Sequence, residues 1–133
     1  MPTVGLRGLK FDAAHYTSGS SSKCGNLHGH TFKVTVEVER PIDPETGMVL
    51  DFDFLRRVVV DVLSEYDHKV LLPSSGARKL ECLDRGEVKL LKYPHATTEY
   101  IAMELAEEIS RRLGTRVRLE LQEGEGGYVR VEV

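Results

Sequence analysis

The chain is poor in cysteine and in side-chain amides, and it contains no tryptophan. Its two cysteines, Cys24 and Cys82, lie far apart and in no paired spacing, so a disulfide-stabilised scaffold is not expected. A reducing, cytoplasmic environment fits them better. Asn26 and Gln122 are the only side-chain amides in 133 residues, a shortage that is typical of proteins from thermophiles.

Long apolar runs and a surplus of positive charge are also missing. No stretch approaches the roughly 18 apolar residues that a membrane helix needs, and the start, MPTVGLRGLKF, has no basic segment followed by an apolar run. We therefore expect neither a membrane span nor a signal peptide. The net charge of −3 argues against a nucleic-acid binder and leaves room for a local basic pocket that holds a phosphorylated small molecule.

Strand patterns open and close the chain, which at this length we interpret as one domain, residues 1–133. The first strand is expected over residues 3–14, and residues 28–39 form a second because polar and apolar side chains alternate strictly along them. "RVRLELQE" and "YVRVEV" predict two further strands around "GEGG". Between the helices, "KLECLDRGEVKLLKY" is interpreted as an additional hairpin that turns at "DRGE".

Two amphipathic segments predict helices. "DFDFLRRVVVDVLSEYDH" has Asp51 or Asp53 as its N-cap, and its apolar stripe consists of Leu55, Val59, Val62 and Tyr66. A second helix begins after Thr97 as N-cap and ends at Gly114, with its stripe at Ile101, Leu105, Ile109 and Leu113. The order of elements, ββααββ with a hairpin between the helices, indicates an α+β domain with both helices on one face of an antiparallel sheet. We expect neighbouring subunits to cover its edges.

The segment "CGNLHGH", residues 24–30, concentrates one cysteine and two histidines. His28 and His30 share parity with the apolar residues of their strand, so both imidazoles are expected on its buried side. They are either hydrogen-bonded core histidines or ligands of one metal ion. His15 is the candidate third ligand, because it ends the preceding strand and consecutive strands usually pair. Three neutral imidazoles favour zinc over cations that prefer oxygen.

The fourth ligand position separates three interpretations of such a site. If Cys24 is a ligand, one thiolate and three imidazoles make a closed structural site. If Cys24 lies just outside, zinc keeps an exchangeable position beside a thiolate, as in a catalytic site. An ordinary zinc hydrolase is less favoured, since "HGH" has glycine where the "HExxH" motif supplies a glutamate base.

Two further positions are ambiguous from the pattern alone. His68 is either a histidine that the negative C-terminal end of the first helix favours, or it forms a carboxylate–imidazole proton relay with Asp67. Glu123 has the parity of the apolar face of its strand. It is therefore either a buried carboxylate that needs a partner or part of a solvated turn beyond the strand.

A family resemblance runs in order across nearly the whole chain, carried by "FDAAH", "CGNLHGHTFKV", "IDPETGMVLDF", "DHK", "TTE" and "LELQE". These segments resemble the 6-pyruvoyl-tetrahydropterin synthase family, which includes the 6-carboxytetrahydropterin synthases of queuosine and archaeosine biosynthesis. The resemblance implies the tunnelling fold, in which subunits form ring-shaped trimers that stack into homohexamers with active sites between subunits. "HATTE" departs from it, with alanine where many relatives have proline, and residues 74–93 match nothing in it.

The resemblance also implies a role for each candidate residue. The zinc ligands would be His15, His28 and His30. The catalytic thiol and the proton-transfer group would be Cys24, Asp67 and His68. Glu123 corresponds to the glutamate that anchors the pterin, and a position near the pterin edge is matched by Thr98 and Glu99.

The implied substrate is 7,8-dihydroneopterin triphosphate, whose side-chain hydroxyls zinc would make more acidic. Cys24 would remove a side-chain proton, and His68 with Asp67 would return protons as triphosphate leaves. The segment "CGNLHGH" resembles the motif of the branch that forms 6-carboxytetrahydropterin and releases acetaldehyde. It is less similar to the motif of the branch that forms 6-pyruvoyl-tetrahydropterin. A family member that binds zinc and a pterin without turnover is the alternative, and Cys24, Asp67 and His68 together argue against it.

Overall fold

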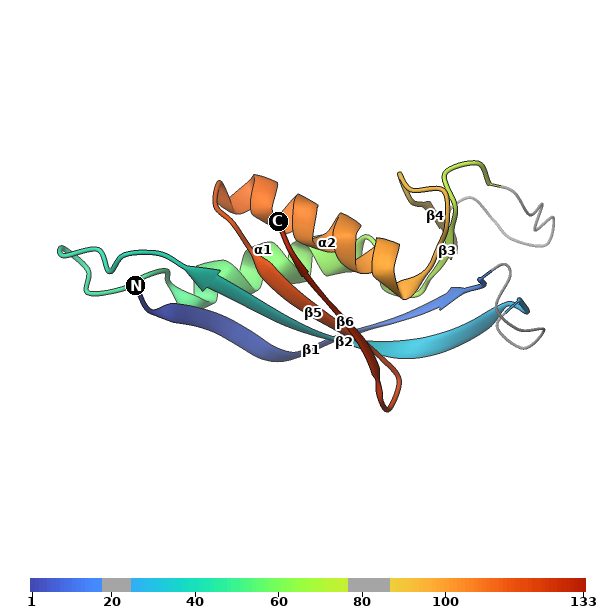
Figure 1. The fold of residues 1–133 in the computed structure, drawn as a ribbon, viewed down its shortest axis with the longest axis horizontal. Helices are drawn as coiled ribbons and strands as arrows, with labels where there is room; N and C mark the ends of the chain where they lie inside the picture. The colour runs from blue at the N-terminus through green and yellow to red at the C-terminus, as the bar shows by residue number, and fades with distance from the viewer. Residues whose placement is uncertain (18–24, 77–86) are drawn as a thin grey trace.

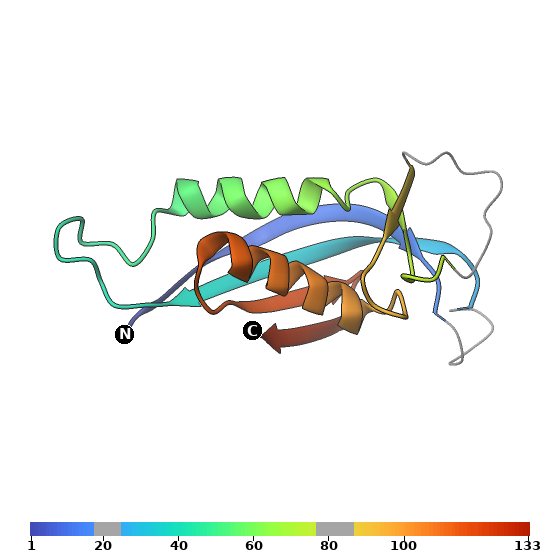
Figure 2. The ribbon, with the colours of Figure 1, turned by 90° about the horizontal axis from the view of Figure 1, so that it is seen from above.

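The computed structural model describes residues 1–17, 25–76 and 87–133. Within these ranges one sheet has the strand order β4-β3-β1-β2-β5-β6, and two helices lie on the same side of it (Figure 1, Figure 2). The strands are β1 (Thr3–His15), β2 (His28–Glu39), β3 (Lys69–Leu72), β4 (Val88–Leu90), β5 (Arg118–Glu123) and β6 (Gly127–Glu132). The helices are α1 (Phe52–Ser64) and α2 (Thr98–Leu113). The α+β class is confirmed.

The long antiparallel ladder between β1 and β2 contains one irregularity with a large effect. The register shifts between Leu6 and Leu9, where Gly8 has a φ of +78°. Such a bulge inserts an extra residue and changes which side chains face each side of the sheet. As a result Leu6 and Leu9, three residues apart, are both buried, and the alternation continues through Phe11 to His15.

Both helices begin at their predicted N-caps, and α2 also ends at its predicted cap. The Asp51 carboxylate accepts hydrogen bonds from the backbone N–H groups of Asp53 (2.7 Å) and Phe54 (3.1 Å) at the start of α1. The Thr97 hydroxyl accepts from Tyr100 N–H at the start of α2, and Gly114 ends that helix in the left-handed conformation. The core lies between these helices and the sheet, with fully buried side chains that include Phe32, Val36, Leu55, Ile101, Leu105 and Leu119. No helix in the described ranges has both the length and the apolar character to cross a membrane.

The first helix is shorter than the sequence predicts. The pattern favours a helix through His68, but α1 ends at Ser64 and residues 65–68 form a turn. The cause is the strand that follows: β3 pairs with β1 in parallel from Lys69, and His68 N–H donates to Asp12 O at 2.6 Å. The chain must therefore leave the helix early, and His68 takes a φ of +60°.

The prediction of a wholly antiparallel sheet is wrong, because β3 runs parallel to β1 and β4 runs parallel to β3. The connection from β2 through α1 brings β3 to the far edge of β1, where the two strands point the same way. The hairpin expected at "DRGE" falls partly in residues 77–86, outside the described residues. Its described second arm, Val88–Leu90, pairs with β3.

A buried carboxylate joins α2 to the segment before it. Glu104 is 7% exposed and accepts hydrogen bonds from the Tyr66 hydroxyl (2.7 Å) and from Lys92 N–H (2.6 Å). Burial, followed by this bond to Glu104, raises the pKa of Tyr66. The carboxylate therefore holds both the turn after α1 and the chain before α2 in place.

We expect Glu104→Ala to lower the free energy of unfolding by about 2–4 kcal/mol, since two buried donors lose their acceptor. Tyr66→Phe removes one donor and should cost only about 1 kcal/mol. Urea unfolding followed by circular dichroism measures both. A Glu104→Ala protein as stable as Tyr66→Phe would contradict this account.

Candidate active site

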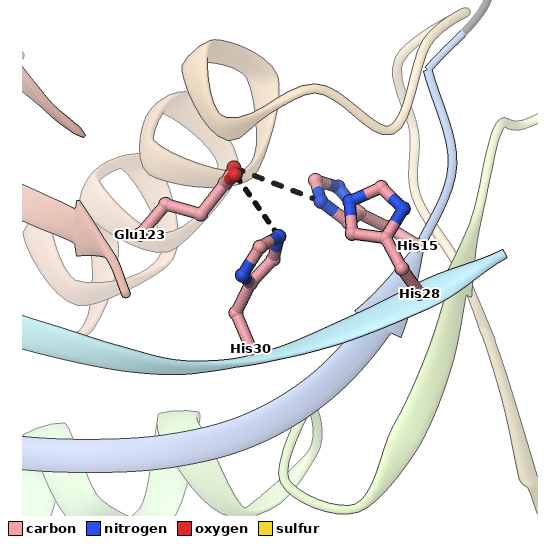
Figure 3. A group of neighbouring side chains, drawn as sticks. All are labelled: His15, His28, His30 and Glu123. Carbon is pink, nitrogen blue, oxygen red and sulfur yellow. Dashed lines mark ion pairs between the residues drawn. The ribbon is translucent and has the colours of Figure 1, made fainter. Parts of the chain in front are cut away.

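Three histidines converge at one end of the β1–β2 ladder. His15 and His28 are register partners, and His30 lies two residues further along β2 on the same face. Their ring centroids are 4.8 Å apart for His15–His28, 4.8 Å for His28–His30 and 5.4 Å for His15–His30. Figure 3 shows the three rings together with Glu123. The bulge at Gly8 contributes to this arrangement, because it sets the parity of His15.

Backbone carbonyls fix the orientation of two of the rings. His15 Nδ1 lies 2.7 Å from Ala96 O, and His28 Nδ1 lies 2.7 Å from Asn26 O. A carbonyl oxygen only accepts, so each Nδ1 must carry the proton, which leaves Nε2 with a free lone pair. Burial lowers the pKa of His15 and keeps its imidazole neutral. Neutral rings with a free Nε2 are what a metal ion requires.

The Nε2 atoms of His15 and His30 are buried and make no hydrogen bond to any residue in the described part of the chain. An unpaired buried polar atom costs about 1–3 kcal/mol, so two in one place call for a common partner. With His28 and Glu123 they form a group whose four ligand atoms all lie within 4.8 Å of one another. This group can hold a metal ion, and its nitrogen-rich donor set suits zinc.

Glu123 is the last residue of β5, and it pairs with Phe32 of β2. Its carboxylate is 29% exposed and accepts a hydrogen bond from the Thr98 hydroxyl at the start of α2. Glu123 Oε1 lies 3.0 Å from His30 Nε2, and Oε2 lies 3.6 Å from His15 Nε2. The strand thus includes Glu123, and of the two readings of the pattern the partnered carboxylate is correct.

Asp67 and His68 belong to a second cluster, completed by Asp12. Asp67 Oδ2 lies 3.0 Å from His68 Nδ1, while Asp67 Oδ1 accepts from Asp12 N–H at 2.9 Å. The bond from Asp12 N–H is the main cause that lowers the pKa of Asp67, with a smaller contribution from the bond to His68. The Thr31 hydroxyl donates to Asp12 Oδ1 at 2.5 Å. The Asp67 carboxylate is therefore fixed in position by hydrogen bonds, beside the imidazole of His68, which is 77% exposed.

The two clusters lie on opposite faces of the β1–β2 pair. Asp12 alternates with buried Phe11 and Ala13, and Thr31 alternates with His30, so both point away from the helices. An open depression of about 590 Å³ lies beside this second cluster, and its lining includes Asp12, Thr31, His68 and Lys69 together with His30 of the first group. Asp12 and Thr31 were not predicted from the sequence. Their parity, opposite to that of the histidines, was the available signal.

Comparison with known proteins adds to this geometry. The family model described as 6-pyruvoyl tetrahydropterin synthase matches residues 6–132. The chain belongs to this family. The resemblance found in the sequence motifs is therefore confirmed, and tetrahydropterin synthases of this family are lyase-type enzymes.

Three curated relatives cover most of the chain. A protein of Pyrococcus abyssi with the provisional name 6-carboxy-5,6,7,8-tetrahydropterin synthase is 35% identical, over 82% of this chain and 74% of its own length. The 6-carboxy-5,6,7,8-tetrahydropterin synthase of Haemophilus influenzae is 33% identical, over 83% of this chain and 78% of its own. The dihydroneopterin monophosphate aldolase of Pyrococcus furiosus is 36% identical, over 92% and 90%.

Solved structures of the family share the fold. A catalytic-residue variant of 6-pyruvoyltetrahydropterin synthase from Plasmodium vivax has a TM-score of 0.85 at 17% identity, covering 99% of this chain and 97% of that one. The 6-pyruvoyl tetrahydropterin synthase of Caenorhabditis elegans has a TM-score of 0.73 at 24% identity, covering 100% and 97%. This chain therefore has the fold of the 6-pyruvoyl tetrahydropterin synthases.

The remaining predicted site residues differ in burial and in their distance from the histidine group, and one of them is not described. Thr98 is 9% exposed, and its hydroxyl contacts Glu123. Glu99 lies in the first turn of α2 with an exposed side chain. Cys24 lies outside the described residues, as does Cys82. The structure thus brings five predicted residues into one group, His15, His28, His30, Glu123 and Thr98, and holds Asp67 with His68 in another.

Proposed function

We propose that this chain is a zinc-dependent 6-carboxytetrahydropterin synthase, which converts 7,8-dihydroneopterin triphosphate with release of triphosphate and acetaldehyde. The observation that carries the proposal is the convergence of the His15, His28 and His30 rings, of which His15 and His30 have buried Nε2 atoms without a hydrogen bond to any described residue. The relatives from H. influenzae and P. abyssi, which bear the name of this synthase, support the choice of product.

Zinc held by the three histidines would supply a Lewis acid that makes two hydroxyls of the substrate side chain more acidic. The protein's own residues do the rest. Ala96 O keeps the His15 ring in the tautomer that presents Nε2 inward. Glu123, with Thr98 donating to Oε2, accepts hydrogen bonds from the amino and ring N–H groups of the pterin. Its charge and its position at the end of β5 suit it to orient that ring.

Proton transfer is assigned to three residues. Cys24, as a thiolate, removes a proton from the substrate side chain. His68 returns protons and assists the departure of triphosphate. Asp67 holds the His68 ring by its contact with Nδ1, and Asp12 N–H keeps Asp67 ionised and in position. Positioned acid–base groups of this kind contribute about 10²–10⁴-fold in rate.

We further propose a homo-oligomer, a hexamer built as a dimer of trimers, with active sites between subunits. The two clusters of one chain face opposite sides of the same strand pair, and His68 is 77% exposed. This arrangement supports a site in which the histidines of one subunit meet Asp67 and His68 of its neighbour. The oligomer would also cover β4 and β6, which form the two edges of the sheet among the described residues.

Mixing two inactive variants tests the shared site. Cys24→Ala and His68→Ala proteins, unfolded and refolded together, should regain activity, because mixed oligomers contain some sites with both groups intact. With random 1:1 assembly about one quarter of the sites would be complete. Each variant refolded alone is the control. A mixture no more active than the controls would show that Cys24 and His68 act within one chain.

Product analysis tests the reaction itself. With 7,8-dihydroneopterin triphosphate, we expect mass spectrometry to detect 6-carboxytetrahydropterin, with acetaldehyde and triphosphate released in equal amounts. A pyruvoyl product without acetaldehyde would assign the chain to the other branch of the family. Binding without any product would identify a pterin-binding protein.

A second candidate comes from one relative. The dihydroneopterin monophosphate aldolase of P. furiosus matches this chain over a larger share of both lengths than the synthases do. The same assay with the monophosphate as substrate decides between them. Faster turnover of the monophosphate than of the triphosphate would favour the aldolase.

A further inference from the structure

We infer that Glu123 is itself a ligand of the metal before substrate arrives, and that it leaves the metal to take hold of the pterin. This inference rests on the proposed function and adds a second role to a residue so far assigned only to pterin binding. The carboxylate would close the fourth position that a catalytic zinc site keeps exchangeable.

The spacing of the ligand atoms is the first argument. Around a tetrahedral zinc ion with bonds of about 2.0–2.2 Å, neighbouring ligand atoms lie about 3.3–3.6 Å apart. The distance from Glu123 Oε1 to His30 Nε2, 3.0 Å, is slightly shorter than that, and the ligand atoms of all four residues lie within 4.8 Å of one another. The carboxylate thus already lies close to the separation that a shared ion requires.

The missing hydrogen bonds are the second argument. If Glu123 were only an acceptor for a histidine N–H, a hydrogen bond should join it to His30 or His15. At 3.0 Å from His30 Nε2 the distance would allow one, yet both Nε2 atoms lack a hydrogen bond to any described residue. Two buried Nε2 atoms that lie beside a carboxylate and have no hydrogen bond to any described residue fit a cation shared between them.

The contact with Thr98 is the third argument, because it gives the two oxygens of the Glu123 carboxylate different roles. Its hydroxyl donates to Oε2, so Oε1 is the oxygen left for a metal. Metal-bound carboxylates are commonly held by such a hydrogen bond from a neighbouring group. Thr98 is the first residue of α2, and its position is fixed by the Thr97 cap. It acts as a positioning residue for Glu123.

The exchange follows from the partial exposure of Glu123 and from its location. The carboxylate is 29% exposed at the end of β5, where Gly124, at a φ of +61°, turns the chain toward β6. It can therefore rotate outward without leaving a buried charge unpaired. Substrate hydroxyls would take the vacated position, and the freed carboxylate would accept the pterin N–H groups.

Metal affinity tests the ligand assignment without any need for turnover. Metal-free protein is titrated with Zn²⁺ in competition with a coloured chelator. We expect Glu123→Gln to bind zinc at least about 10-fold more weakly, because even outer-shell partners contribute about 10–100-fold. Thr98→Val should have a smaller effect in the same direction. Glu120→Gln, which removes one charge from the opposite face of the same strand, should bind as the wild type does. Equal affinity of Glu123→Gln and Glu120→Gln would overturn the assignment.

Spectroscopy tests the exchange. Co²⁺ replaces zinc, and a pterin without a side chain at C6 is added, a ligand that has no hydroxyls to offer the metal. The visible spectrum of the wild type should change, because Glu123 leaves the metal, while that of Glu123→Gln should not. Pterin binding that quenches protein fluorescence and leaves the wild-type cobalt spectrum unchanged would overturn the exchange. A protein that binds no pterin contradicts the proposed function, whereas the zinc titration still decides the ligand.

Discussion

Cys24→Ala is expected to lower turnover of 7,8-dihydroneopterin triphosphate by about 10²–10⁴-fold while the protein keeps its zinc and its oligomeric state. In the proposed mechanism the thiolate acts as a base toward the substrate, and the group formed by the three histidines and Glu123 can hold a metal without it. Steady-state kinetics, metal analysis and light scattering measure the three properties on one preparation.

Cys82→Ala is the matched control, since it removes the other cysteine of the chain and should leave turnover unchanged. A Cys24→Ala protein that sheds its metal would place the thiolate among the ligands. The site would then be a closed structural one, and the catalytic assignment would fail.

His28→Ala is expected to reduce zinc affinity by more than about 10²-fold, since a direct ligand contributes more than the outer-shell groups worth about 10–100-fold. His28 is suited to this test because it lies at the very start of β2, partly exposed, so its truncation leaves the core intact. Metal analysis after gel filtration should find well below one equivalent, with an unchanged far-ultraviolet circular dichroism spectrum.

The control for this variant is His95→Ala, because the exposed His95 ring stacks on Tyr100 and does not belong to the group of four candidate ligands. It should retain full zinc. If His28→Ala also purifies with a full equivalent, the metal has other ligands, and the assignment of the three histidines is wrong.

Local patterns predicted the elements that carry the histidines. The strict alternation of residues 28–39 fixed β2 to the residue, and the parity of His28 and His30 within it indicated a shared face. The helix caps Asp51, Thr97 and Gly114 were also readable, because capping depends on a few neighbouring residues.

Features that depend on partners far away in the sequence could not be predicted from local patterns. β3 has only four residues, a lysine followed by three apolar residues, and this pattern does not indicate which strand it pairs with, so the parallel edge of the sheet was missed. Tyr66 continues the apolar stripe of α1 and suggested a longer helix, whereas its hydroxyl is bound by Glu104, 38 residues away. The contact of Thr98 with Glu123 likewise joins two segments that only the fold brings together.

Because of the bulge at Gly8, the effect of deleting one residue from β1 depends on where the deletion falls. The register of residues 9–15 is set by the buried side chains of Phe11, Ala13 and His15, so a deletion between them would shift the pairing and turn His15 or the residues before it to the other face of the sheet. Deletion of Gly8 itself would remove the extra residue, so that Leu6 and Leu9 would lie two residues apart, both still on the buried face, in a ladder of continuous register. Loss of a residue at the bulge would thus leave the pairing at the histidine end of the ladder unchanged.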